Sequence, residues 1–173
     1  ALPIYAVARK AGAIELAAVI GTTFAPTLVI NELTTVATAY AMAQWLDNGV
    51  IAGPAPSLQI AAGMAENLVA AATGTTSTVI RSSPNADETN TQRELATLAN
   101  ILAACTQDSP GACPALFALT QSSGGTKPTT LFQAIVNIAR NPAANVAKLF
   151  ALGDAVKTFT PALTAEQGPL SAN

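Results

Sequence analysis

The stretch N-T-Q-R-E-L-A-T-L-A-N-I-L-A-A-C-T-Q-D-S-P-G-A-C-P-A-L-F, residues 90–117, decides the fold. Its apolar residues at positions 95, 98, 99, 102 and 105 recur at helical spacing, which predicts a helix with one apolar face. The D-S-P-G sequence at 108–111 predicts a tight turn. Pro114 suits the first turn of a second helix, because that position needs no backbone N–H. The sequence therefore predicts a helical hairpin, around which the rest of the chain is arranged.

The two cysteines of the chain, Cys105 and Cys113, lie at the two ends of this turn. A disulfide between them would close a short loop and remove about 2–3 kcal/mol of unfolded-chain entropy. It would also indicate an oxidising compartment. The alternative is a pair of free buried thiols in a cytoplasmic helical protein. The spacing is not C-x-x-C, so no redox role is expected.

The composition excludes several classes of function. Charged residues are 10% of the 173 residues and the net charge is -2, which gives no basis for a nucleic-acid partner. Histidine is absent, which removes the commonest general base and transition-metal ligand. We therefore expect no catalytic residues, no metal site and no cofactor. So few charges repel other copies only weakly, so self-association is favoured.

A transmembrane protein is not expected. A membrane-spanning helix needs about 20 consecutive apolar residues. The nearest candidate run, residues 14–40, is interrupted by Gly21, Pro26, Asn31 and Glu32.

Helical periodicity dominates the remaining chain, so the predicted fold is mainly α: a compact bundle of five to seven short helices with a small N-terminal β element. Residues 1–157 are predicted to form a single helical domain, and 158–173 a C-terminal tail or linker. The alanine-rich segment 12–22 is predicted to be a short helix ending at Gly21. Asn31 is a good N-cap for the next helix. A further helix is predicted over 57–73, followed by Gly74, and the segment 75–88 is predicted to be a loop.

Residues 1–10 alternate in hydrophobicity with a period of two, which predicts a strand. A lone strand is not stable, so it needs a partner. The candidates are residues 27–30 and a strand from another domain or subunit. In the second case Leu2, Ile4, Tyr5, Val7 and Arg9 would form an assembly strand that completes a sheet in the next subunit.

Two other classes of function compete with a structural role. A binding module for a glycan or a small apolar ligand would use Tyr40, Trp45 and the loop 75–88. An enzyme using carboxylates alone, with Glu32 and Glu66 or Glu15 and Glu94 as the pair, ranks last. We expect that the protein is not an enzyme.

Four segments resemble a known family: I-N-E-L-T-T-V-A-T-A-Y-A-M-A at 30–43, T-L-A-N-I-L-A-A-C at 97–105, C-P-A-L-F at 113–117 and N-I-A-R-N-P-A-A-N-V-A-K-L-F-A-L at 137–152. They are similar to a helical module of large secreted bacterial proteins, which precedes NHL-type β-propeller repeats. The resemblance implies an extracellular module without an assigned activity, and carries over no catalytic residues. The pattern departs from that family in having no propeller after residue 152, as expected of either a fragment or a stand-alone relative.

These observations together predict a non-catalytic extracellular or cell-surface structural module. The expected partners are copies of the chain, forming a homo-oligomer or polymer such as a filament or surface layer, or adjacent domains of a larger protein that the module would scaffold.

Overall fold

The computed structural model describes residues 2–10, 12–22, 26–47 and 49–172. Ala1 and Asn173, the outer ends of the predicted strand and tail, lie outside the described residues. In chain order the elements are β1 (Ile4–Arg9), β2 (Glu15–Gly21), α1 (Glu32–Met42), the 3-10 turn η1 (Ala43–Trp45), β3 (Leu46–Asp47), β4 (Val50–Ile51), α2 (Ala55–Leu68), β5 (Val69–Ala70), β6 (Thr75–Thr76), α3 (Thr78–Arg81), α4 (Asn85–Glu88), α5 (Thr91–Thr106), α6 (Ala112–Leu119), α7 (Leu131–Arg140) and α8 (Val146–Asp154).

The fold is mainly α with small β elements, as the sequence predicts. The described part of the chain has eight α-helices rather than five to seven. The extra helices are α3 and α4, single turns of four residues each in the segment 75–88 that was expected to be a loop. Within the same described residues there are three antiparallel sheets of two strands each.

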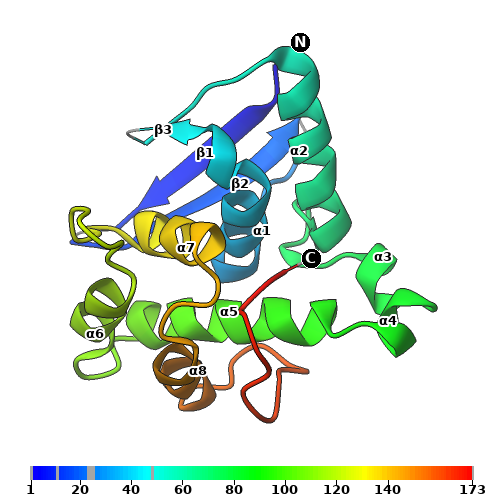
Figure 1. Cartoon of the computed structure of the whole chain (residues 1–173). Helices are drawn as coiled ribbons and strands as arrows, with labels where there is room; N and C mark the ends of the chain where they lie inside the picture. Colours follow the sequence, from blue (N-terminus) through cyan, green and yellow to red (C-terminus); the bar gives the residue numbers. More distant parts are fainter. Residues whose placement is uncertain (1, 11, 23–25, 48, 173) are drawn as a thin grey trace.

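The central hairpin of α5 and α6 is confirmed. Figure 1 shows α5 crossing the lower half of the molecule, with α1 above it and α8 below. The sequence predicts one apolar face for this helix, but every residue from 95 to 105 is buried, so all faces of this part of α5 are covered. With neighbours on several sides, α5 is the axis of the core rather than a helix with one solvated face.

The N-terminal strand pairs within the chain. β1 forms an antiparallel hairpin with β2, whereas residues 27–30 form no strand and Val29 N–H donates to the Ala71 carbonyl oxygen at 2.9 Å. The prediction of a helix over 12–22 is therefore wrong. Alanine favours a helix locally, but β1 supplies cross-strand hydrogen bonds on one side of β2, and tertiary pairing outweighs that weak preference.

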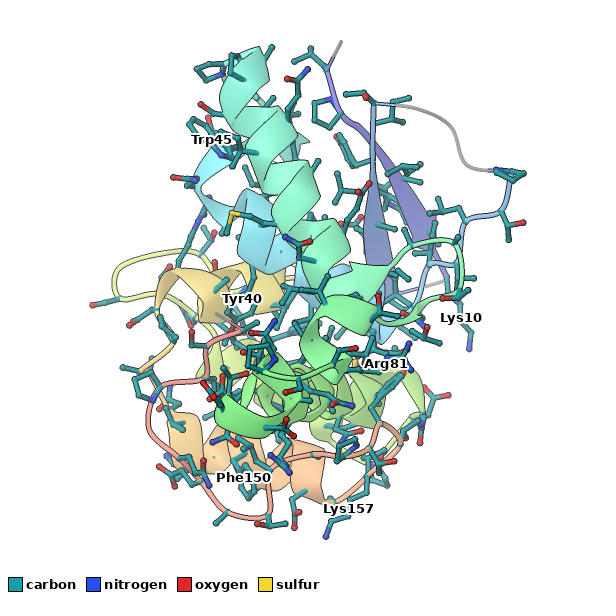
Figure 2. The ribbon with its side chains drawn as sticks, turned by 90° about the vertical axis from the view of Figure 1, so that its right-hand side faces the viewer. Lys10, Tyr40, Trp45, Arg81, Phe150 and Lys157 are labelled. Atoms are coloured by element: carbon teal, nitrogen blue, oxygen red, sulfur yellow. A yellow bond between two sulfur atoms is a disulfide. The ribbon has the colours of Figure 1, made fainter. Side chains whose placement is uncertain are left out.

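Threonines of α1 cover the other edge of β2. Ala17 and Val19 each donate their backbone N–H, at 3.0 Å, to the hydroxyls of Thr35 and Thr38 respectively. Both threonines are at most 1% exposed. A helix cannot continue a sheet, so these hydroxyls satisfy edge groups that would otherwise be buried without partners. The hairpin is thereby fixed to the helical core along β2, and β1 is the outer strand (Figure 1). Figure 2 shows the same hairpin in a view turned by 90°.

The second predicted helix ends earlier than its apolar pattern indicates. α2 begins at Ala55 and stops at Leu68, and residues 69–76 form the small hairpin of β5 and β6. Gly74 lies in its turn with φ +66°, and a Cβ at this position would approach Val29 Cγ1 to 2.4 Å. Glycine is thus required both by the left-handed backbone and by the close packing.

The C-terminal segment 158–172 packs on the helices, mainly through side chains that bond its backbone. The buried Asn100 accepts from Phe159 N–H at 2.7 Å and donates to Phe159 O at 2.9 Å. Further along, Leu163 and Leu170 are buried, and Tyr40 donates its hydroxyl to Leu170 O at 2.7 Å. The segment therefore forms part of the walls of the cavities described below.

Candidate functional site

The outer edge of β1 is the first candidate site. Lys10 N–H donates to Ile14 O within the hairpin, so the backbone groups of Ala8 and Ala6 face β2, and the register shifts between Tyr5 and Ile4. The N–H groups of Ala17 and Val19 point away from β1 toward α1, which gives the same alternation from the other strand. The backbone N–H and C=O groups of Tyr5, Val7 and Arg9 consequently point away from β2. No other strand in the described residues pairs with this edge.

The predicted assembly residues occupy this strand with one exception. Ile4, Tyr5, Val7 and Arg9 lie in β1, whereas Leu2 precedes it and is 58% exposed. Tyr5 and Val7 pack partly against the core, and Arg9 forms an ion pair with Glu15 of β2 at 2.6 Å. β1 is therefore not an unpaired segment. One of its edges pairs with β2, and its other edge is open.

The two cysteines are joined. Cys105 and Cys113 form a disulfide between the end of α5 and the start of α6, and their Cα atoms are 4.8 Å apart. Gly111 precedes α6 with φ +75°, a left-handed conformation that reverses the chain within the predicted turn. The structure thus places the two sulfur atoms at bonding distance, and the pair links the two helices.

The two aromatic residues predicted as ligand contacts lie in different surroundings. Trp45 packs on Gly53, where a Cβ would come within 2.6 Å of its ring. The indole N–H of Trp45 is buried and has no hydrogen-bond partner among the described residues. Tyr40, in contrast, lines a cavity together with two residues of the segment 75–88. The structure therefore brings together Tyr40 and that segment, and places Trp45 elsewhere.

This cavity, which we call the α2–α3 cavity, has a volume of about 520 Å³. Its apolar wall consists of Ala41, Met64, Leu68 and Ile80, with Ala172 from the C-terminal segment. Three polar residues, Asn67, Asn85 and Thr91, also line it. Volumes of about 300–1,000 Å³ with mostly apolar walls are typical of small-molecule sites.

Burial perturbs the pKa of Tyr40, which lines this cavity, and of Glu94 on α5. Burial, with a smaller contribution from the Glu94 carboxylate, raises the pKa of the Tyr40 hydroxyl well above its usual value. Burial likewise raises the pKa of Glu94, on the first turns of α5. Tyr40 is therefore neutral at ordinary pH, and its hydroxyl donates a hydrogen bond to the Leu170 carbonyl oxygen.

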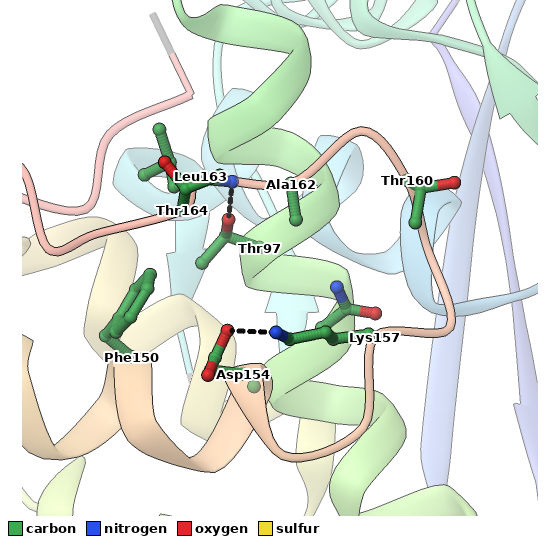
Figure 3. A pocket seen from close by; sticks show the side chains of 10 residues that line it. Thr97, Phe150, Asp154, Lys157, Thr160, Ala162, Leu163 and Thr164 are labelled. Atoms are coloured by element: carbon green, nitrogen blue, oxygen red, sulfur yellow. Dashed lines mark hydrogen bonds and ion pairs between the residues drawn. The ribbon is translucent and has the colours of Figure 1, made fainter.

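A smaller hollow of about 180 Å³ lies between α5, α8 and the C-terminal segment (Figure 3). Several of its polar groups already have partners. Thr97 accepts from Leu163 N–H at 3.0 Å, and Lys157 pairs with Asp154 at 3.2 Å. Because its volume is below the usual range and several of its polar groups already have partners, this hollow is a weaker candidate than the α2–α3 cavity.

The carboxylates named as catalytic pairs have separate neighbours. Glu15 bonds Arg9 and accepts from Thr130 at 3.4 Å, whereas Glu94 lies beside Tyr40. Glu32 accepts from the Thr106 hydroxyl. No helix in the described residues has both the length and the hydropathy to cross a membrane.

Comparison of the chain with protein-family models, with curated proteins and with solved structures gives no match. No relative therefore bears on the fold or on the site, and the resemblance to a secreted helical module remains a prediction.

Signals for the two strongest sites are present in the sequence to different degrees. The period-two pattern of residues 1–10 predicts the strand. Of the residues predicted for assembly, Tyr5, Val7 and Arg9 present backbone groups to the open edge, whereas Leu2 precedes the strand and Ile4 lies beyond the register shift. The cavity residues Met64, Leu68 and Ile80 were not predicted as site residues. Their only sequence signal is an apolar character shared with the core.

Proposed function

We propose that the protein is a non-catalytic, extracellular structural module that assembles with copies of itself through the outer edge of β1. The observation that carries the proposal is this edge, at which Tyr5, Val7 and Arg9 present N–H and C=O groups to no strand of the described chain. Exposed strand edges are templates for pairing with another chain. The disulfide supports the extracellular placement, because such bonds persist in oxidising compartments.

The partner strand is β1 of a second copy, running antiparallel. Pairing centred on Val7 sets Tyr5 of one copy opposite Arg9 of the other, and all three outward-facing residues gain cross-strand hydrogen bonds. Parallel pairing in register would instead bring the two Arg9 side chains together, and adjacent like charges are destabilising. Pro3, which has no N–H to donate, limits the usable edge to residues that follow it.

This contact makes a two-fold pair, which is a closed arrangement. A filament or surface layer therefore requires a second contact between pairs, and electron microscopy of concentrated material would show whether pairs, filaments or layers form. Removing residues 1–10 would take away the partner of β2, so that truncation would disturb the monomer as well as the assembly.

A sharper experiment replaces Val7 by proline. Because the Val7 N–H points away from β2, proline removes a donor from the open edge without removing a hydrogen bond of the β1–β2 hairpin. Val7→Ala is the matched control, since it loses comparable side-chain packing and keeps the N–H. We expect Val7→Pro to sediment as a monomer over a concentration series in which wild type and Val7→Ala associate. Association of a folded Val7→Pro variant to the wild-type extent would contradict the proposal.

A further inference from the structure

The α2–α3 cavity lies on the side of the molecule that Figure 2 faces, where α2, α3 and α4 meet, with Tyr40 behind them. Its walls come from five helices, α1, α2, α3, α4 and α5, and from the C-terminal segment. The cavity is separate from the outer edge of β1, so what it binds is independent of the proposed assembly.

The chemistry of the walls narrows the class of ligand. None of the described residues lining the cavity carries a formal charge. A charged group entering it would lose its hydration without gaining an ion-pair partner, which is costly. The wall residues Met64, Leu68 and Ile80 are aliphatic or thioether side chains, and they match the body of an aliphatic molecule.

The polar lining is limited to a few neutral groups. The Asn85 side chain donates one N–H to the Val79 carbonyl oxygen at 3.0 Å, and the Tyr40 hydroxyl donates to Leu170 O in the C-terminal segment. The amides of Asn67 and Asn85 still contain carbonyl oxygens that accept hydrogen bonds. A single hydrogen-bonding end on a ligand can be satisfied here, whereas a buried sugar needs partners for many hydroxyls.

One apolar wall residue of the cavity is itself exposed, and further exposed apolar side chains lie on the same helices. Met64 itself is 50% exposed, and Ile60 and Val79, on the adjoining turns of α2 and α3, are 67% and 46% exposed. Methionine adapts its shape to irregular apolar partners. An exposed apolar wall residue in an uncharged cavity favours a ligand that leaves water readily and needs no ion pair.

We propose that the α2–α3 cavity binds an uncharged small molecule with an aliphatic body and one hydrogen-bonding end, in the class of a medium-chain alcohol or amide. The aliphatic body lies against Met64, Leu68 and Ile80, and the polar end reaches the amide of Asn67 or Asn85. Two other occupants, a carboxylated chain and an apolar side chain from a second copy, make different predictions and are separated by the experiment below.

The test uses the whole chain with its methionine methyl groups labelled with ¹³C. The chain has two methionines: Met64 lines the cavity, and Met42, 1% exposed in the core, is an internal control. Titration with 1-decanol should shift the Met64 methyl resonance saturably and leave Met42 in place. Decanoate at neutral pH should bind at least tenfold more weakly. No saturable shift of Met64, equal shifts of both methionines, or equal affinity for decanoate would overturn the proposal.

Two tryptophan variants on the same helix localise the binding. Asn67 and Ile60 are both exposed, but only Asn67 lines the cavity. Asn67→Trp should cover the opening and weaken 1-decanol binding at least tenfold, while Ile60→Trp should bind as wild type does. A Met64 resonance that moves with protein concentration and ignores 1-decanol would assign the cavity to a second copy instead. The Val7→Pro variant should bind 1-decanol normally, so failure here is distinguishable from failure of the assembly at β1.

Discussion

Replacing Thr38 by valine tests how the N-terminal hairpin is attached to the helical core. The Thr38 hydroxyl accepts from Val19 N–H at 3.0 Å, and the two residues are 1% and 4% exposed. Valine has nearly the shape of threonine and cannot accept the bond. Leaving a buried N–H without a partner costs about 1–3 kcal/mol, offset in part by a better-buried methyl group at about 0.8 kcal/mol. We therefore expect Thr38→Val to lower the free energy of unfolding by about 1–2 kcal/mol.

The assay combines urea unfolding, followed by circular dichroism, with amide hydrogen exchange. Thr38→Ser is the control, because it keeps the hydroxyl and loses only a methyl group. In Thr38→Val the Val19 amide should exchange faster relative to its neighbours, whereas in Thr38→Ser its relative protection should be retained. Unchanged stability together with an unchanged Val19 amide would refute the reasoning that these hydroxyls hold the edge of β2.

Three further perturbations follow from the structure. Reducing the Cys105–Cys113 disulfide, which spans a sequence separation of 8, should cost about 2.5 kcal/mol and lower the melting temperature by about 5–10 °C in a calorimetric scan. Gly74→Ala should destabilise the fold by about 1–3 kcal/mol in urea, because of its positive φ and close packing, whereas Gly63→Ala in the open middle of α2 should stabilise it by about 0.5–1 kcal/mol. Folding raises the pKa of Glu94 above its usual 4.5, so its contribution to stability is fully present below that pH and is lost as the pH rises. Glu94→Gln should therefore be more stable than wild type at neutral pH in urea unfolding. The difference between the two should vanish in acid.

The parts of the fold that depend on local sequence could be predicted, and those that depend on long-range pairing could not. The turn between Cys105 and Cys113 is encoded within a few residues, and so is the cap at Asn31, whose side chain accepts from Thr34 N–H at 3.0 Å. The strand at Glu15–Gly21 is alanine-rich and resembles a helix when considered alone. It becomes a strand because β1 and the threonines of α1 occupy its two edges, and neither partner is evident in its own sequence.

In the candidate site, too, individual residues could be predicted from the sequence, but their arrangement in space could not. Tyr40 and the segment 75–88 were both predicted as ligand contacts, but their meeting around one cavity depends on how α1, α2 and α3 pack. Trp45 was predicted for its aromatic character alone. In the structure its ring packs closely on Gly53, which follows the small hairpin of β3 and β4. This contact within the fold occupies one side of the ring.

Hydrogen exchange at β1 tests the proposed assembly most directly. Amides of Ala6 and Ala8 face β2 and should be protected at every protein concentration. Amides of Tyr5, Val7 and Arg9 should exchange freely in dilute monomer and become protected as the protein associates. If those three amides stay unprotected in the associated material, copies meet through another surface and the role assigned to the outer edge of β1 is wrong.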